Sequence, residues 1–169
     1  MLIILEGGDG SGKTTLHKKL IKAGAKSISI LRHDNLAMYK YMECLHQPER
    51  YFVMDRSFIT DLVYRINDGE KRDVMNLMDM ATILRHINLI IIHCETDTSF
   101  EDGMKRGEDN ITDKTEAETI KSIYRLVMKM LTIFADTKVL HYDWHLDDDN
   151  EVIRFINRKS DYKNKLKEI

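Results

Sequence analysis

A glycine-rich turn near the N-terminus constrains this chain more than any other feature. Residues 7–14 read GGDGSGKT and satisfy the pattern G-x-x-x-x-G-K-[ST]. An apolar run at residues 2–5 precedes the turn, and a helix is predicted to begin at about Lys13. In such a turn, glycine amides can curl around a phosphate group while the helix N-terminus adds a positive dipole end. The sequence therefore predicts a nucleotide-binding phosphate loop.

The residue types in this turn suggest how it would hold a nucleotide and a metal ion. Lys13 can reach the β- and γ-phosphates, and the Thr14 hydroxyl can bind Mg²⁺. ATP and Mg²⁺ are therefore the expected cofactors. The residues predicted to contact them are Gly7, Gly8, Asp9, Gly10, Ser11, Gly12, Lys13, Thr14 and Thr15.

Short apolar runs alternate with longer amphipathic stretches along the chain. Strands are predicted at residues 2–5, 27–31, 51–54, 89–93 and 139–142, and helices at 13–23, 35–46, 58–67, 73–87, 99–105, from 115 onward, and at 151–158. This alternation is typical of βαβ units. The expected fold is the three-layer α/β sandwich of P-loop NTPases, with a five-stranded, mostly parallel sheet and helices on both faces.

Length and composition narrow the class of protein further. A chain of 169 residues is expected to form one domain, residues 1–169. Its net charge of −2 gives no basic field for nucleic acid, and its two cysteines suit a reducing compartment. No apolar run is long enough for a signal peptide or a bilayer span, so a cytoplasmic protein without a membrane partner is expected. The Met-rich stretch at 73–87 is expected in the core, although such a surface can also pair subunits into a homodimer.

A second acidic residue is expected beside the phosphate loop. The predicted strand at 51–54 ends in Asp55, and the carboxyl ends of neighbouring parallel strands face one crevice. Asp55 could there join the Mg²⁺ shell, and Arg56 could clamp a phosphate with two hydrogen bonds. Asp55 could also cap the helix that follows.

Two motifs resemble those of known nucleotide kinases. Residues 6–15, EGGDGSGKTT, resemble the E-G-x-D-G-x-G-K-[ST]-T start of thymidylate kinases. Residues 55–64, DRSFITDLVY, resemble that family's D-R-Y-x-x-S-x-x-A-Y, while Ser57 and the Thr60-Asp61 pair are similar to the E-R-S-x-x-S-D of deoxynucleoside kinases. The resemblance is thus to the wider thymidylate and deoxynucleoside kinase group, and its motifs cover the first 65 residues.

The resemblance implies transfer of the γ-phosphoryl group of ATP to a nucleotide or nucleoside, with thymidine monophosphate as the first expectation. Asp9 would contact the 3′-hydroxyl of the acceptor sugar, and Arg32 would bind an acceptor phosphate. Asp34 could instead be a general base for a hydroxyl acceptor. The implied assignments are catalytic roles for Lys13, Asp55, Arg56, Arg106, Asp9 and Asp34, substrate contacts from Asp9, Arg32 and Arg56 within an acceptor region at 32–65, and metal ligands Thr14 and Asp55.

A polar stretch at about residues 105–115 lies before the predicted long helix. Kinases of this group close a lid over ATP at this place, which excludes water from the reaction. Arg106 would then reach the transferring phosphoryl group; the alternative is an ordinary solvated loop. Thr115 and Glu118 fit a capping box at the start of the helix.

The acceptor segment is short, which leaves the substrate class open. Asp55 lies only 23 positions after Arg32, whereas thymidylate kinases have a longer segment here with two helices. An open pocket could admit a polymer, so one alternative is a kinase of a DNA hydroxyl such as a hydroxymethylated pyrimidine base, an activity of phage-encoded relatives that would imply a phage origin. The near-neutral charge counts against it. A third reading is a nucleotide-binding switch module without kinase activity. The D-R-S element at residues 55–57 and the predicted lid argue against it, and the absence of the N-K-x-D signature of GTPases argues against GTP as its nucleotide.

Overall fold

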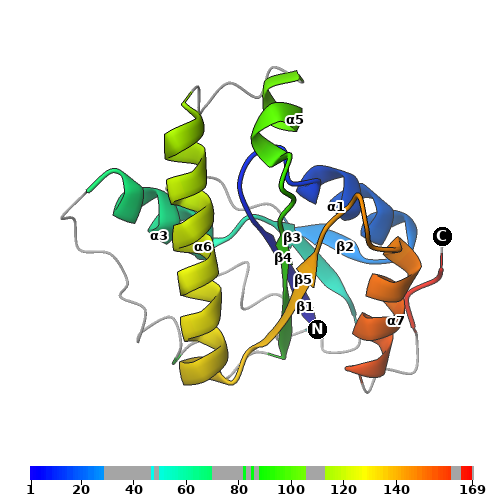
Figure 1. The fold of residues 1–169 in the computed structure, drawn as a ribbon. Helices are drawn as coiled ribbons and strands as arrows, with labels where there is room; N and C mark the ends of the chain where they lie inside the picture. The colour runs from blue at the N-terminus through cyan, green and yellow to red at the C-terminus, as the bar shows by residue number, and fades with distance from the viewer. Residues whose placement is uncertain are drawn as a thin grey trace.

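The computed structural model describes residues 1–28, 47, 50–69, 82, 85, 88–105, 113–160 and 165–168. These residues form both strands and helices, in the order β1-α1-β2-β3-α3-β4-α5-α6-β5-α7 (Figure 1). The strands are β1 (Leu2–Glu6), β2 (Lys26–Ile28), β3 (Phe52–Asp55), β4 (Leu89–Cys94) and β5 (Lys138–Tyr142). The helices are α1 (Lys13–Lys22), α3 (Phe58–Asn67), α5 (Ser99–Lys105), α6 (Lys114–Ala135) and α7 (Asp149–Arg158).

The five strands form one parallel sheet in the order β2-β3-β1-β4-β5. β1 lies at its centre, paired with β3 on one side and β4 on the other. Every residue of β1 and β4 is buried, which explains why these strands read as continuous apolar runs rather than alternating ones. The predicted α/β fold is confirmed, and all strand pairs described are parallel.

Helices cover both faces of the sheet, giving the predicted three layers (Figure 1). Leu2 and Ile4 of β1 belong to one apolar core, with α3 and α6. Ile3 and Leu5 belong to a second core, with α1 and α7. α5 lies beyond the carboxyl ends of the strands (Figure 1). This arrangement leaves the carboxyl edge of the sheet as the place where loops from several strands meet.

Two predicted helix caps are wrong. α6 begins at Lys114, and its cap is Asp113, whose side chain accepts a hydrogen bond from the Thr115 amide at 3.0 Å. Thr115 is therefore already inside the helix and does not form the capping box. α3 is capped by Ser57, which accepts from the Ile59 amide at 3.1 Å, so Asp55 is not the cap.

Some predicted elements cannot be compared with the structure. The predicted helices at 35–46 and 73–87, and residues 29–31 of the second strand, lie wholly or almost wholly outside the described residues. In the part of the chain that is described, no helix combines the length and apolar character needed to cross a membrane.

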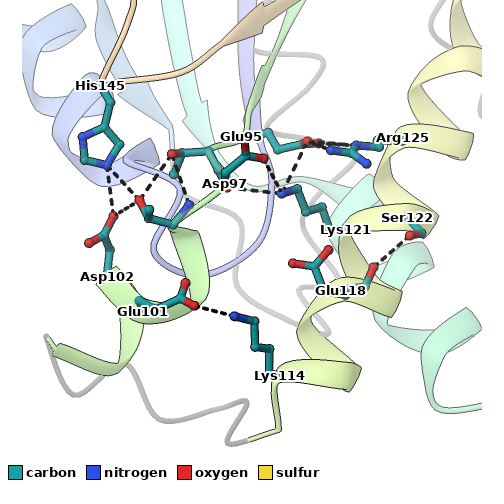
Figure 2. Close-up of polar contacts among 12 residues, drawn as sticks. Glu95, Asp97, Glu101, Asp102, Lys114, Glu118, Lys121, Ser122, Arg125 and His145 are labelled. Carbon is teal, nitrogen blue, oxygen red and sulfur yellow. Dashed lines mark hydrogen bonds and ion pairs between the residues drawn. The ribbon is translucent and has the colours of Figure 1, made fainter.

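Charged side chains tie α5 and α6 to the carboxyl edge of the sheet (Figure 2). Glu95, directly after β4, accepts two hydrogen bonds from Arg125 Nε at 2.8 and 3.1 Å. Lys114 at the start of α6 donates to Glu101 of α5 at 2.7 Å. His145, in the loop after β5, lies 3.1 Å from Asp102 of α5. These contacts hold both helices at the edge where the glycine-rich loop emerges.

Candidate active site

The predicted phosphate loop connects β1 to α1 at the centre of this edge. Gly10 and Gly12 have positive φ angles of 79° and 84°, a conformation that glycine adopts without steric cost. Gly12 is the N-cap of α1 and provides no side-chain hydrogen bond to the first turn. The N-cap side chain therefore does not occupy the first amides of α1. A helix that binds phosphate needs these amides as donors to the phosphate oxygens.

Lys13 lies inside the curl of the loop. Its side chain is buried, and Nζ donates to the Gly8 carbonyl oxygen at 2.5 Å and to Ser11 Oγ at 3.2 Å. Ser11 Oγ in turn donates to the same Gly8 oxygen at 2.8 Å. Burial is the main cause that lowers the pKa of Lys13 from its usual value. The residue predicted to hold phosphates thus sits at the centre of the turn.

The two predicted metal ligands meet. Thr14 Oγ1 donates to Asp55 Oδ2 at 3.2 Å, joining the start of α1 to the end of β3. Asp55 Oδ1 is buried and has no hydrogen-bond partner among the described residues. A hydroxyl and a carboxylate suit Mg²⁺, which binds few protein oxygens and takes water and phosphate oxygens as its other ligands. The pair therefore fits the expected ion.

Arg56 and Asp9 also come together. The Arg56 guanidinium forms an ion pair with Asp9, while the Arg56 amide donates to the Leu5 carbonyl oxygen at 3.0 Å. The remaining carboxylate oxygen of Asp9, Oδ2, is buried without a partner among the described residues, and so is the hydroxyl of Tyr64 on α3. Polar atoms able to bind a substrate are thus present beside the loop.

Backbone atoms of α5 pack directly against the loop. A Cβ placed on Gly10 would lie 1.7 Å from the carbonyl oxygen of Ser99 and 2.8 Å from the amide of Gly103. No side chain separates the two segments at this point. The importance of Gly103 was not predicted, because a glycine in a short helix gives no sequence signal of what it will contact.

Trp144 is a second neighbour of the loop that sequence analysis did not single out. A Cβ on Gly12 would lie 2.7 Å from the Trp144 indole, so the ring rests against the start of α1. Trp144 follows β5, and the ring of the next residue, His145, is tilted by 30° to the indole at a centroid distance of 3.8 Å. The sequence did offer one indication of this role: Trp144 comes just after a predicted parallel strand, where the chain reaches the carboxyl edge of the sheet.

A cavity of about 30 Å³ lies between the loop, α5 and α6. Asp9, Ser11, Phe100 and Tyr124 are among its lining residues, together with His93 of β4. Burial is the main cause that lowers the pKa of His93 to about 4, so the imidazole is neutral at pH 7. The cavity is large enough for ordered water.

Several predicted residues cannot be placed. Arg32, Asp34 and Arg106 lie outside the described residues, as do residues 106–112 of the predicted lid. Thr15 is exposed on α1. Glu6, which the kinase motif includes but to which no role was assigned, is completely buried and accepts hydrogen bonds from Ser57 and Thr60.

No protein-family model and no curated protein matches the chain, whereas solved structures do. YorR from Bacillus subtilis, crystallised with phosphorylated GDP, matches with a TM-score of 0.64 and 21% identity over 92% of this chain and 93% of that one. Deoxyadenosine kinase from M. mycoides with bound dCTP matches with a TM-score of 0.60 and 19% identity over 94% and 98%. Its complex with dATP gives 0.59 and 19% over the same shares.

These likenesses extend over nearly the whole of each chain and carry no information on a phage origin. At about one fifth identity they establish the architecture and leave the substrate open. The five-stranded parallel sheet, the loop at its carboxyl edge and these matches agree: the chain has the P-loop α/β fold of the deoxynucleoside kinases and of YorR.

Proposed function

We propose that the protein is a P-loop kinase that transfers the γ-phosphoryl group of ATP to a nucleoside or nucleotide. The observation that carries this proposal is the contact between Thr14 and Asp55, 3.2 Å apart, next to the buried ammonium of Lys13. A metal-binding pair and a phosphate-binding lysine at one edge of a parallel sheet are the common parts of phosphoryl-transfer sites.

The proposed reaction depends on positioning and charge. Loop amides and Lys13 would hold the β- and γ-phosphates in place. Thr14 and Asp55 would hold Mg²⁺, which supplies neutralisation of charge on the phosphate oxygens when bound. Arg56 would exchange part of its contact with Asp9 for a phosphate, because its fork of donors matches phosphate oxygens. The chain would form one kinase domain, with Arg106 reaching the phosphoryl group from a lid at about 105–115.

The acceptor would lie beside Asp9. The partnerless Oδ2 of Asp9 and the Tyr64 hydroxyl are buried polar atoms that a sugar hydroxyl could satisfy. Arg32 would bind the phosphate of a monophosphate acceptor, or Asp34 would accept a proton from a hydroxyl acceptor. Deoxyadenosine kinase and YorR were solved with deoxynucleoside triphosphates and phosphorylated GDP, which supports an acceptor of this class. Thymidine monophosphate is the first acceptor to test.

The direct test is an acceptor screen with γ-labelled ATP and Mg²⁺. We expect label in the product of at least one nucleoside or nucleoside monophosphate. Label that enters DNA in proportion to its modified bases would instead support the DNA kinase. ATP hydrolysis without any labelled acceptor would support the switch module and contradict the proposal.

Trp144 offers an optical measurement of nucleotide binding. It is the only tryptophan of the chain, and its indole lies against Gly12 at the start of α1. We expect a saturable change in its fluorescence on titration with ATP, because a phosphate group at the loop would alter the surroundings of the ring. Trp144→Phe should remove the signal, and free tryptophan should show none with the same nucleotide. An unchanged spectrum at saturating ATP would contradict this placement of the nucleotide.

A further inference from the structure

A buried carboxylate at the end of β1 has no part in the site proposed above. Glu6 has no exposed surface. Its Oε1 accepts a hydrogen bond from Ser57 Oγ at 2.5 Å, and its Oε2 accepts one from Thr60 Oγ1 at 2.6 Å. Each carboxylate oxygen therefore has its own hydroxyl donor, and both donors belong to the beginning of α3. An ionised carboxylate, which only accepts, suits this arrangement.

The two hydroxyls are held in turn by other groups. Ser57 Oγ accepts from the Ile59 amide as the cap of α3. Because the Thr60 hydroxyl donates to Glu6, it accepts from the Tyr124 hydroxyl, 3.0 Å away on α6. The hydrogen bonds thus form one buried chain from β1 through α3 to α6. Such networks fix geometry when every member is satisfied.

The segment that Glu6 holds is the one that carries Arg56. Arg56 directly precedes Ser57 and has a φ of 68°, a left-handed conformation that is sterically unfavourable for a non-glycine residue. Its amide is bonded to Leu5, the residue before Glu6. Backbone strain of this kind persists only where surrounding contacts determine the conformation. Two consecutive residues of β1 provide those contacts: Leu5 through its backbone carbonyl oxygen and Glu6 through its side chain.

Burial raises the pKa of Glu6 above its usual value, whereas the hydrogen bonds from Ser57 and Thr60 and the charges of Lys13 and Arg56 favour the ionised carboxylate. The hydrogen bonds of the Glu6 carboxylate go to Ser57 and Thr60 rather than to Thr14 or Asp55, and complete burial keeps it from meeting a substrate. Any influence on the reaction must therefore pass through the residues that it holds.

We propose that Glu6 is a positioning residue: its carboxylate holds the turn at residues 55–57 so that the Arg56 guanidinium meets the phosphates. This inference rests on the proposed function for its effect on turnover. The contact between Glu6 and the turn is a property of the fold and can be tested without turnover.

The first test is Glu6→Gln, which keeps the shape of the side chain and replaces one acceptor oxygen by a donor. One of the two hydroxyls then loses its acceptor, and the turn shifts. We expect kcat to fall about 100-fold, the loss that a misplacement of about 1 Å can cause. The KM for ATP and ATP binding measured by Trp144 fluorescence should stay near their wild-type values, and the protein should remain folded with a somewhat lower melting temperature, because one buried hydroxyl lacks its acceptor. Parallel losses of ATP binding and folding would show a general structural role and overturn the inference.

A double-mutant cycle tests whether Glu6 acts through Arg56. Arg56→Lys removes the forked guanidinium and should itself lower kcat. If Glu6 works by placing that guanidinium, adding Glu6→Gln to Arg56→Lys will lower kcat little further. If the fold-loss of kcat in the double variant equals the product of the two single fold-losses, the two residues act independently, and this would contradict the inference.

Glu95→Gln is the matched control. Glu95 also follows a central strand and accepts hydrogen bonds from α6, through Arg125, but it does not contact the Arg56 turn. Its replacement should leave kcat unchanged. A loss equal to that of Glu6→Gln would mean that any carboxylate anchoring α6 has the same effect.

A readout without turnover separates the two proposals. The NMR signal of the Arg56 Nε–H can be assigned because it is missing from the spectrum of Arg56→Lys. Its position reports the pairing of the guanidinium with Asp9. Glu6→Gln should shift or broaden this signal, and Glu95→Gln should not. If the wild type transfers phosphate to no acceptor, the proposed function fails while this measurement still decides the role of Glu6. An unchanged signal in Glu6→Gln would overturn that role.

Discussion

Lys13→Ala should lower the rate of phosphoryl transfer by at least about 100-fold, the loss typical of removing one fixed charge donor from a transition state. The ammonium is buried in the loop and already donates to Gly8 and Ser11. In the proposed site the ammonium would neutralise charge on the transferring phosphoryl group from a fixed position. Water that fills its place in the variant carries no charge and is not held in that position. The measurement is the initial rate with γ-labelled ATP and the acceptor found in the screen.

The fold should survive this substitution, because burial already disfavours the charged form of Lys13. Circular dichroism and thermal melting would check this. Lys18→Ala, at an exposed position of the same helix, is the control and should keep its rate. If Lys13→Ala unfolds, Lys13→Arg retains the charge and tests the role in a folded protein. A Lys13→Ala protein with the full wild-type rate would refute the proposed role.

Gly10→Ala should reduce the free energy of unfolding by about 3 kcal/mol, since it combines overpacking with a strained backbone. The new Cβ would lie 1.7 Å from the Ser99 carbonyl oxygen, and the residue has a φ of 79°. A backbone carbonyl cannot rotate away as a flexible side chain can, so the loop must move off α5. We therefore expect weaker ATP binding as well as lower stability. Denaturant unfolding and the Trp144 titration measure the two effects.

Gly69→Ala separates the two causes. Gly69 has a φ of 64°, and a methyl group added there would meet no atom of the described residues within 4 Å, so its substitution is expected to add backbone strain alone, roughly 1–2 kcal/mol. Gly8→Ala is a second comparison: its new methyl group would meet no atom of the described residues within 4 Å, and Gly8 does not have a positive φ. If Gly10→Ala costs no more stability than Gly69→Ala, the loop and α5 are not in the close contact described above.

The sequence was most informative where a local pattern determines the structure. Continuous apolar runs identified β1 and β4, because strands buried on both faces have no polar alternation. The meeting of Thr14 with Asp55 could be predicted because parallel strands end at one edge. The cap of α6 was misassigned because Asp113 and Thr115, two positions apart, offer the same capping chemistry. Only the fold decides which of the two residues is the N-cap of the helix.

The features that were missed depend on contacts between distant segments. Glu6 reads as the polar end of a strand, and nothing nearby in the sequence shows that Ser57 and Thr60 will bond to it. Trp144 and Gly103 likewise acquire their meaning from the loop that they contact. A single sequence does not show which distant residues will be in contact. Gly12 and Trp144, for example, are more than one hundred positions apart.

The central place of β1 has a consequence for how the molecule opens. Leu5 and Glu6, which fix Arg56, belong to the strand with neighbours on both sides, whereas β2 and β5 lie at the edges of the sheet. Edges fray first in native-state hydrogen exchange, and central strands open only with the whole domain. The Arg56 amide will therefore exchange with the slowest class of protons. Thermal fluctuations that loosen the edge strands therefore leave the backbone geometry at Arg56 intact.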